Sequence, residues 1–427
     1  MKLLVCGDVH IGRASSRVPE LIAREQVWTV RAWQAAVDLA IREKVDLLCL
    51  TGDVADQDNR FWEAIGPLEQ GIASLAASGI RTVAVSGNHD YDVLGRLADS
   101  LATSLRDQFI LLGRGGTWQR ETIHRAGHPV LHIDGWSFPA RHVERSPLDD
   151  YPPHPAGDVP VVGMVHGDLD DPNSRYAPLD LTRLRRTGVS VWLLGHVHAP
   201  RLENESGLAC VLYPGSPQAM DPGESGLHGA WIVHVEPAGV TSCELKPLSS
   251  VRYHELTVDL DNVDDESVFQ STLVDRVRAE ATRLVEPSGE HLLAVSVRLN
   301  LVGRTAISHR LPALCDELAD DLDLAIGAAR VGVEKIVNRT TPPLDLVAHA
   351  RGTTAVSVLA RLLLELDQEE TPKELSELIR QAEQRIQETR HRRDYLGIPE
   401  AADGRPARDI LKEQASALLG ELVGETS

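Results

Sequence analysis

The N-terminal part of the chain alternates short apolar runs with segments of helical periodicity. The runs Leu3–Cys6, Asp46–Thr51 and Ile80–Ser86 have the length and composition of buried strands. Between them, the segments from about Glu20 to Lys44 and from about Phe61 to Ala77 carry apolar residues at helical spacing and predict two helices. Strand, helix, strand, helix, strand is the pattern of parallel β-α-β units joined by crossover helices. This alternation predicts an α/β fold.

Each of these apolar runs ends in residues that can bind a metal ion. The third run passes directly into Gly87-Asn88-His89-Asp90, and two later runs, 159–165 and 189–194, also end in histidines. Because ligands of open α/β sheets gather at the carboxyl ends of strands, we expect the five tips to converge at one end of a parallel-type sheet. The side chains at these tips are those of Asp8, His10, Asp53, Asn88, His89, His166, His196 and His198.

Each of these residues also has an ordinary structural explanation when it is taken alone. An Asp-x-His sequence is expected about once by chance in a chain of this length, and a lone histidine at a strand end is usually solvated or part of the core. The recurrence of the same kinds of residue at five tips is what favours a shared metal site.

The number and type of these side chains fit two divalent metal ions. Mixed oxygen and nitrogen ligands suit manganese, iron or zinc better than calcium or magnesium. Two ions about 3.5–4 Å apart activate a bridging hydroxide and stabilise an in-line phosphoryl displacement. One ion can be held by Asp8, His10 and His198, the other by Asn88, His166 and His196, and Asp53 can bridge them because a carboxylate has two oxygens.

The rest of the tetrapeptide is predicted to be catalytic. His89 follows the candidate ligand Asn88 and is expected to face the substrate, where it stabilises developing charge or protonates the leaving alkoxide. Asp90 is expected either to orient His89 or to brace the loop.

Composition limits the class of protein. A chain of 427 residues is long enough for two or three domains. Its net charge of -20 argues against whole-surface binding to nucleic acid or to an anionic membrane, although a local basic groove or a metal-neutralised site remains compatible with it. The five scattered cysteines suggest no disulfide framework, and no apolar segment is long enough to span a bilayer. We expect a cytoplasmic protein without a membrane partner.

The pattern changes near Ser250. The runs 208–213, 229–235 and 240–245 predict a terminal antiparallel set, and residues 251–343 then predict a small β-α-β-α-β domain. The remainder is helical, with a capping box at Thr371–Glu374 and a helix end at Gly397–Pro399. Its short apolar stripes fit packing within the domain and partner binding about equally well. The predicted domains are therefore 1–250, 251–343 and 344–427.

The motifs together resemble those of the calcineurin-like metallophosphoesterase superfamily, in order and in rough spacing, over about residues 1–250. Those motifs are Asp8-x-His10, Gly52-Asp53, Gly87-Asn88-His89-Asp90, His166 and Gly195-His196-x-His198. Within the superfamily the chain is similar to SbcD-type DNA repair exonucleases, on the evidence of Gly195–Pro200, Tyr213–Pro217 and the small domain that follows. The resemblance implies a four-layer sandwich of two mixed β-sheets flanked by helices, with an α/β cap and a helical C-terminal region.

The resemblance also implies an activity and partners. It implies manganese-dependent phosphodiester hydrolysis on DNA ends or hairpins, with iron and zinc as alternative metals. It implies an SbcC-type coiled-coil ABC ATPase that docks on the helices after the cap, and a homodimer formed through the catalytic domain.

Two other functions remain open on the sequence. The same ions would serve a small-substrate phosphodiesterase or phosphatase, for example one acting on a cyclic nucleotide, and the chain could also be a mainly structural subunit that tethers an ATPase to DNA. A nuclease needs local cations to meet phosphate charge, but each candidate is more often an ordinary solvated charge. The candidates are Arg13, Arg17, Arg60 and Arg141 near the site and Arg298, Arg304 and Arg310 on the cap.

Overall fold

The computed structural model describes residues 1–56, 60–101, 105–152, 157, 159–205, 208–237, 239–343, 345–368, 372–390 and 407–424. It divides into two compact units. The first comprises 1–254, 280–297 and 323–334, and the second comprises 255–279, 298–322 and 335–427. The predicted domain limits of 1–250, 251–343 and 344–427 stay predictions, because the division into units runs through the strands of one sheet.

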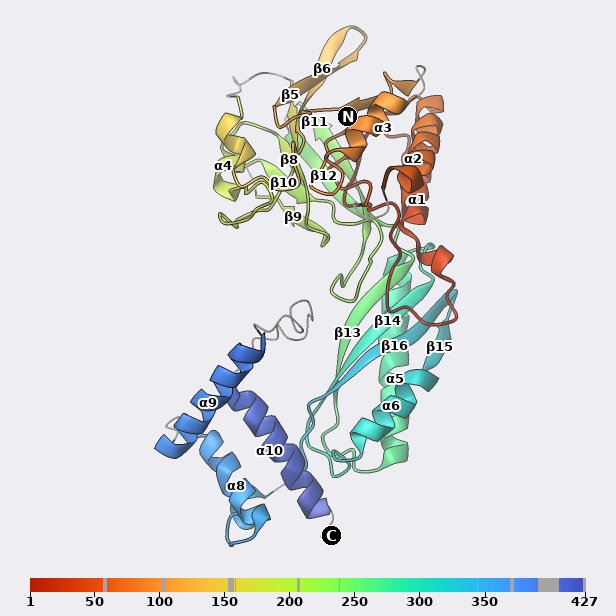
Figure 1. Ribbon diagram of the computed structural model, residues 1–427. Coiled ribbons are helices and arrows are strands. Elements are labelled where there is room, and N and C mark those ends of the chain that lie inside the picture. Colours follow the sequence, from red (N-terminus) through yellow and green to blue (C-terminus); the bar gives the residue numbers. More distant parts are fainter. Residues whose placement is uncertain are drawn as a thin grey trace. The chain divides into compact units, whose positions relative to one another are not determined.

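The first unit contains a six-stranded mixed sheet with the order β12-β11-β1-β2-β3-β4 (Figure 1). Strands β1 to β4 are parallel, whereas β11 is antiparallel to β1 and β12 is antiparallel to β11. The strands are β1 (Lys2–Cys6), β2 (Leu47–Leu50), β3 (Arg81–Ala84), β4 (Phe109–Leu111), β11 (Gly229–Glu236) and β12 (Gly239–Pro247). The helices that connect them are η1 (Arg24–Val27), α1 (Thr29–Arg42), α2 (Arg60–Ala77) and α3 (Val93–Ser100).

A second six-stranded sheet has the order β5-β6-β7-β8-β10-β9. Its four inner strands are parallel, and β5 and β9 pair antiparallel at the two edges. The strands are β5 (Gln119–Arg125), β6 (His128–Trp136), β7 (Val161–His166), β8 (Val191–Gly195), β9 (Arg201–Glu203) and β10 (Cys210–Tyr213). Two short helices accompany this sheet, η3 (Pro147–Asp150) and α4 (Leu181–Arg185).

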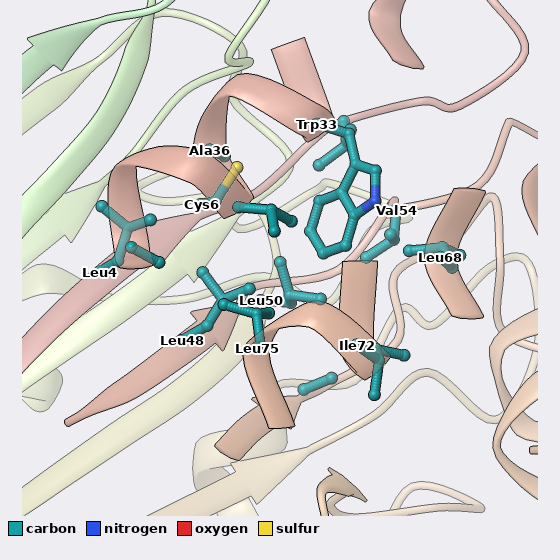
Figure 2. Close-up of a cluster of buried hydrophobic side chains, with 14 of the residues drawn as sticks. Leu4, Cys6, Trp33, Ala36, Leu48, Leu50, Val54, Leu68, Ile72 and Leu75 are labelled. Atoms are coloured by element: carbon teal, nitrogen blue, oxygen red, sulfur yellow. The ribbon is translucent and has the colours of Figure 1, made fainter. Parts of the chain in front are cut away.

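The alternation of side chains along β1 divides the core into layers. Leu3 and Val5 pack between the two sheets, against residues such as Met164 and Leu193 of the second sheet. Leu4 and Cys6 point the other way, into a cluster with Trp33 of α1 and Leu68, Ile72 and Leu75 of α2 (Figure 2). A third cluster covers the outer face of the second sheet and includes Trp192 and Leu184 of α4. Figure 1 shows α1, α2 and α3 on one side of the sheets and α4 on the other. The predicted four-layer sandwich of two mixed sheets is therefore confirmed.

Several details differ from the sequence-based expectations. The five strand tips do not belong to one sheet, because β1, β2 and β3 lie in the first sheet and β7 and β8 in the second. Strand β10 is not part of an antiparallel terminal set, since it pairs in parallel with β8. The first long helix begins at Thr29 rather than near Glu20, because the preceding segment forms a loop and the short helix η1. Edge strands β5 and β9 were not predicted, since their polar sequences lack apolar alternation.

A third sheet has four strands in the order β13-β14-β16-β15. Its elements are β13 (Val251–Asp259), α5 (Glu266–Val285), η4 (Glu286–Ser288), β14 (Ala294–Val302), α6 (Leu311–Asp321), β15 (Asp323–Ile326) and β16 (Ala329–Asn338). The predicted final strand is thus a hairpin, in which Asp323 pairs with Gly332 across the turn at Gly327. Strand β15 is short and partly exposed, which explains why the sequence did not reveal it.

The C-terminal residues of the second unit are helical. The helices are α7 (Leu346–His349), α8 (Ala355–Leu366), α9 (Lys373–Arg390) and α10 (Ala407–Gly424). Ala360 and Leu363 of α8 pack against Ala415 and Leu419 of α10 in a small core of their own. Thr371 of the predicted capping box and the predicted helix end at 397–399 lie outside the described residues. Within the part of the chain that the structure describes, every helix is too short or too polar to cross a membrane.

Candidate metal centre

The two sheets bring their strand tips together at one place in the first unit. Asp8 and His10 follow β1, Asp53 follows β2 and Asn88 follows β3, while His166 ends β7 and His196 follows β8. Contacts join the two sets, since the backbone N–H of His196 donates to Oδ1 of Asp8 at 3.0 Å. The seven predicted metal ligands therefore lie close together, although they come from two sheets.

The backbone at this site is unusual. Asp8, His10, Asp53 and His196 all have a positive φ, of 49°, 48°, 49° and 100°. Residues other than glycine adopt a positive φ at a cost in free energy, and residues with this backbone conformation concentrate at functional sites. Gly87 is required for a different reason, because a Cβ at this position would lie 2.2 Å from Oδ1 of Asp53.

The three residues of the first predicted ligand group lie close together. The ligand atoms of Asp8, His10 and His198 lie within 4.8 Å of one another. Nε2 of His10 is 3.1 Å from Nε2 of His198. Asp8 and His10 are almost fully buried, whereas the side chain of His198 is 25% exposed.

The residues of the second predicted group and Asp53 also lie close together. Oδ1 of Asn88 lies 3.0 Å from Nε2 of His166 and 3.2 Å from Nδ1 of His196. Oδ2 of Asp53 lies 3.3 Å from Nε2 of His166 and 3.9 Å from Nε2 of His10. Asp53 therefore faces one imidazole from each predicted group, which is the position a bridging carboxylate needs.

The hydrogen bonds around His166 show that these residues fit a cation. Nδ1 of His166 lies 3.1 Å from the carbonyl oxygen of Thr51, which can only accept, so Nδ1 carries a proton. The lone pair on Nε2 of the neutral ring then faces the oxygens of Asn88 and Asp53, and buried electron-pair donors in contact need a proton or a cation between them. Burial opposes protonation of His166, but the carboxylates of Asp53 and Asp8 together outweigh burial and raise the pKa of the imidazole.

Asp53 shows the same balance from the acidic side. Burial would raise the pKa of its carboxyl group, but the imidazoles of His166 and His10 outweigh burial and hold that pKa below its ordinary value. The carboxylate is therefore ionised, and it also accepts a hydrogen bond from the backbone N–H of His89 at 2.8 Å. Together with the imidazoles, it offers the mixed oxygen and nitrogen ligands that suit divalent transition metals.

Asp56 is a site residue that the sequence reasoning missed. Its Oδ1 lies 3.4 Å from Nδ1 of His10 and 3.6 Å from Nδ1 of His89, and the three residues form a further group that could hold a cation. Burial opposes ionisation of Asp56, but the adjacent imidazoles of His10 and His89 lower the pKa of its carboxyl group. The nearby carboxylate of Asp56 in turn raises the pKa of His89. The position of Asp56, three residues after Asp53, was a signal available in the sequence.

His89 and Asp90 occupy different environments. The side chain of His89 is 32% exposed, whereas Asp90 is fully buried. The carboxylate of Asp90 accepts hydrogen bonds from the backbone N–H groups of Val54 and Gly87, both at 2.7 Å. Burial and the nearby charge of Asp53 raise the pKa of Asp90, while these backbone donors oppose the rise. Of the two predicted roles for Asp90, the geometry favours bracing, since Asp90 joins the loop after β2 to the loop after β3.

The basic residues proposed from the sequence are scattered. The charge of Arg13 reaches the site, since it contributes to lowering the pKa of Asp56. Arg17 and Arg141 are exposed, and Arg310 pairs with Glu266 in the second unit. The side chain of Arg60 lies outside the described residues.

Comparison with known proteins gives the family of the N-terminal region. A family model described as calcineurin-like phosphoesterase matches residues 1–200, and a model described as the middle domain of metallophosphoesterase YhaO matches residues 253–341. The uncharacterized metallophosphoesterase YhaO of Bacillus subtilis is 28% identical over 260 residues, which span 59% of this chain and 62% of YhaO. The DNA double-strand break repair protein Mre11 of Methanopyrus kandleri is 24% identical over 266 residues, which span 57% of this chain and 56% of Mre11.

These matches extend over part of each relative, because the chain spans less than two thirds of the length of YhaO and of Mre11. Among solved structures, a dimetal phosphatase from Danio rerio aligns with 58% of this chain and 99% of its own, at 15% identity and a TM-score of 0.37. The family match over residues 1–200 supports a relationship of this region to the calcineurin-like metallophosphoesterases and implies a metal-dependent hydrolase.

Proposed function

We propose that this protein is a two-metal phosphodiesterase that hydrolyses DNA. The observation that carries the proposal is the position of Asp53, whose Oδ2 faces His166 on one side and His10 on the other. Asp8, His10 and His198 would hold one divalent ion, Asn88, His166 and His196 the other, and Asp53 both. When bound, two such ions activate a water molecule and neutralise charge on the phosphate.

The chain's own residues would handle the leaving group. The side chain of His89 is 32% exposed, somewhat more than those of His198 at 25% and His196 at 21%, so a bound substrate can reach this imidazole. Asp56 favours the protonated form of His89. A protonated imidazole beside the scissile bond can donate its proton to the leaving alkoxide. We assign His89 as the proton donor and Asp56 as the residue that orients it.

A row of side chains leading away from His196 favours a nucleic-acid substrate over a small diester. The ring of Tyr176 packs against His196 with centroids 4.9 Å apart, and His142 packs against Tyr176 at 5.6 Å. Nη2 of Arg175 lies 3.3 and 3.4 Å from the two ring nitrogens of His142, which places the guanidinium over the ring face, because in the ring plane it would collide with Cε1. A row of aromatic and basic side chains can stack on the bases of a single nucleic-acid strand and pair with its phosphates.

The row is held in place by backbone hydrogen bonds. The N–H of Val143 donates to the carbonyl of Arg175 at 2.9 Å, and the N–H of Ala177 donates to the carbonyl of Val143 at 2.7 Å. The N–H of Asp168 donates to the carbonyl of Tyr176 at 2.9 Å, and Asp168 lies two residues after His166. The loops that carry the row are thus tied to a strand tip of the metal centre.

The narrower assignment to an SbcD-type repair nuclease is also a proposal. It is supported by the sequence motifs and by the Mre11 relative, which is described as a DNA double-strand break repair protein. We propose manganese as the metal, with iron and zinc as alternatives, and an SbcC-type ATPase that docks on residues 344–427. Val347, Val358, Leu378 and Leu418 in this region are large apolar side chains that remain exposed. A homodimer formed through the catalytic domain rests on the resemblance alone.

The experiment that tests this function is manganese-dependent digestion by the full-length chain of linear and hairpin DNA, run beside a small diester, bis(p-nitrophenyl) phosphate. We expect the wild type to cleave DNA and His89→Ala to lose most of that cleavage. Cleavage of the small diester alone would favour a small-substrate phosphodiesterase. DNA binding without hydrolysis of either substrate would favour a structural tether. Deletion of 354–427 should abolish binding to the ATPase while leaving cleavage of the small diester intact.

A further inference from the structure

The carboxylate of Glu224 contacts a predicted metal ligand from outside the ligand set. Its Oε1 lies 2.6 Å from Nδ1 of His198. Its Oε2 accepts hydrogen bonds from the backbone N–H of Met220 at 2.8 Å and from the hydroxyl of Ser216 at 3.3 Å. The side chain of Glu224 is 11% exposed, so its orientation is set by these neighbours rather than by solvent.

This contact determines which nitrogen of His198 is available to a metal ion. A carboxylate accepts hydrogen bonds, so Nδ1 of His198 carries the proton and Nε2 of the neutral ring keeps its lone pair. That Nε2 lies 3.1 Å from Nε2 of His10, inside the group formed with Asp8. We propose that Glu224 is a positioning residue that fixes the tautomer and ring orientation of His198 for one of the two metal ions. The inference rests on the proposed metal assignment.

The segment that carries Glu224 is held by hydrogen bonds within the chain. The N–H of Glu224 donates to the carbonyl of Asp221 at 2.9 Å, which closes a tight turn. Ser216 is fully buried, and its N–H donates to the carbonyl of His198 at 2.9 Å while its hydroxyl contacts Glu224. One residue thus fixes both the backbone of the ligand and the carboxylate that orients it. This gives the Tyr213–Pro217 motif a physical role.

The test is to titrate the metal-free full-length chain with Mn²⁺ and to measure binding by isothermal titration calorimetry. We compare the wild type with Glu224→Ala, which removes the acceptor, and with Glu224→Gln, which keeps an oxygen acceptor without the charge. Ser216→Ala loosens the carboxylate while leaving it in place. Glu236→Gln removes a negative charge at an exposed position on β11 and is the matched control. Thermal unfolding of each metal-free variant is measured in parallel.

We expect the wild type and Glu236→Gln to bind two Mn²⁺ ions. Glu224→Ala should weaken one of the two sites roughly 10- to 100-fold and leave the other unchanged, as the loss of a partner behind a ligating histidine does. Glu224→Gln and Ser216→Ala should weaken Mn²⁺ binding at that site by a smaller factor than Glu224→Ala does. Unchanged binding in Glu224→Ala, or equal weakening of both sites together with a lower unfolding temperature, would overturn the positioning role. A wild type that binds no Mn²⁺ would overturn the proposed metal assignment and this inference with it.

Discussion

Oδ1 of Asp56 lies 3.6 Å from Nδ1 of His89, and only two residues separate Asp56 from the central carboxylate of Asp53. The loop after β2 therefore supplies both the residue that faces the two ligand groups and the residue that orients the exposed imidazole. His89 in turn donates its backbone N–H to Asp53 at 2.8 Å. The proposed proton donor and the proposed bridging ligand are thus held in one arrangement.

Replacing His89 should impair the chemical step without emptying the metal site. We expect His89→Ala to lower kcat for bis(p-nitrophenyl) phosphate by about 10²- to 10⁴-fold, because general acid catalysis contributes an effect of this size. Asp56→Asn should lower kcat by a smaller factor, roughly tenfold, because His89 remains but loses its charged partner. Steady-state kinetics with Mn²⁺ measures both. Mn²⁺ affinity, measured by calorimetry, should stay at the wild-type value in His89→Ala, and full activity in that variant would show that His89 is not the proton donor.

A methyl group at Gly87 should disrupt the metal centre. The added Cβ would lie 2.2 Å from Oδ1 of Asp53, so the carboxylate or the loop must move. We expect Gly87→Ala to lower Mn²⁺ affinity at least tenfold, an effect of the size seen when ligand orientation is lost. The matched control is Gly95→Ala in α3, where a Cβ meets no atom within 4 Å. That variant should bind Mn²⁺ normally and gain roughly 0.5–1 kcal/mol of stability from its higher helix propensity. Equal Mn²⁺ affinity in the two variants would contradict the packing argument.

Tyr176 should contribute base-dependent affinity for a single DNA strand. We expect Tyr176→Ala to weaken binding of a thymidine oligonucleotide roughly 5- to 100-fold, because stacking on one aromatic ring is worth about 1–3 kcal/mol per base. The affinity for an abasic oligonucleotide of the same length should be the same in Tyr176→Ala as in the wild type. Fluorescence anisotropy measures both affinities, and His142→Ala repeats the test with a side chain that is one step further from His196. Arg186→Ala, an exposed position after α4, is the charge control and should bind as the wild type does. Equal losses for both oligonucleotides would rule out stacking.

Metal removal should lower the stability of the first unit. Ligands bound only by the folded state stabilise it, by about 2.7 kcal/mol for each site at a concentration 100 times its Kd. We therefore expect Mn²⁺ to raise the unfolding temperature of chelator-treated protein, as followed by differential scanning calorimetry. Asp53→Asn should show little of this rise, since it alters the ligand shared by both ions. A rise of the same size in that variant would indicate that Mn²⁺ binds elsewhere.

Local patterns in the sequence predicted the buried strands of the first unit and the candidate ligands that follow them, whereas the four layers were implied by the family resemblance. Apolar runs such as Leu3–Cys6 are recognisable as buried strands, and the motif residues follow them directly. Strand β5 was missed because its sequence is polar along an exposed edge. Local sequence patterns also could not assign the strand tips to two sheets. That assignment depends on the order of the strands, which short motifs do not encode.

The supporting residues of the site were harder to predict for a similar reason. Glu224 is 26 positions away from His198, and only the turn at Asp221 brings its carboxylate back to the imidazole. Tyr176 and His142 lie on two loops joined by backbone hydrogen bonds. Asp56 could have been predicted from the sequence, because it is the next acidic residue after Asp53 in the same loop.

The most direct test of the two-metal assignment is an anomalous difference map from crystals grown with Mn²⁺, recorded near the manganese absorption edge. We expect two peaks, one among Asp8, His10 and His198 and one among Asn88, His166 and His196, with the carboxylate of Asp53 between them. A single peak, or a peak among His10, Asp56 and His89, would contradict the assignment.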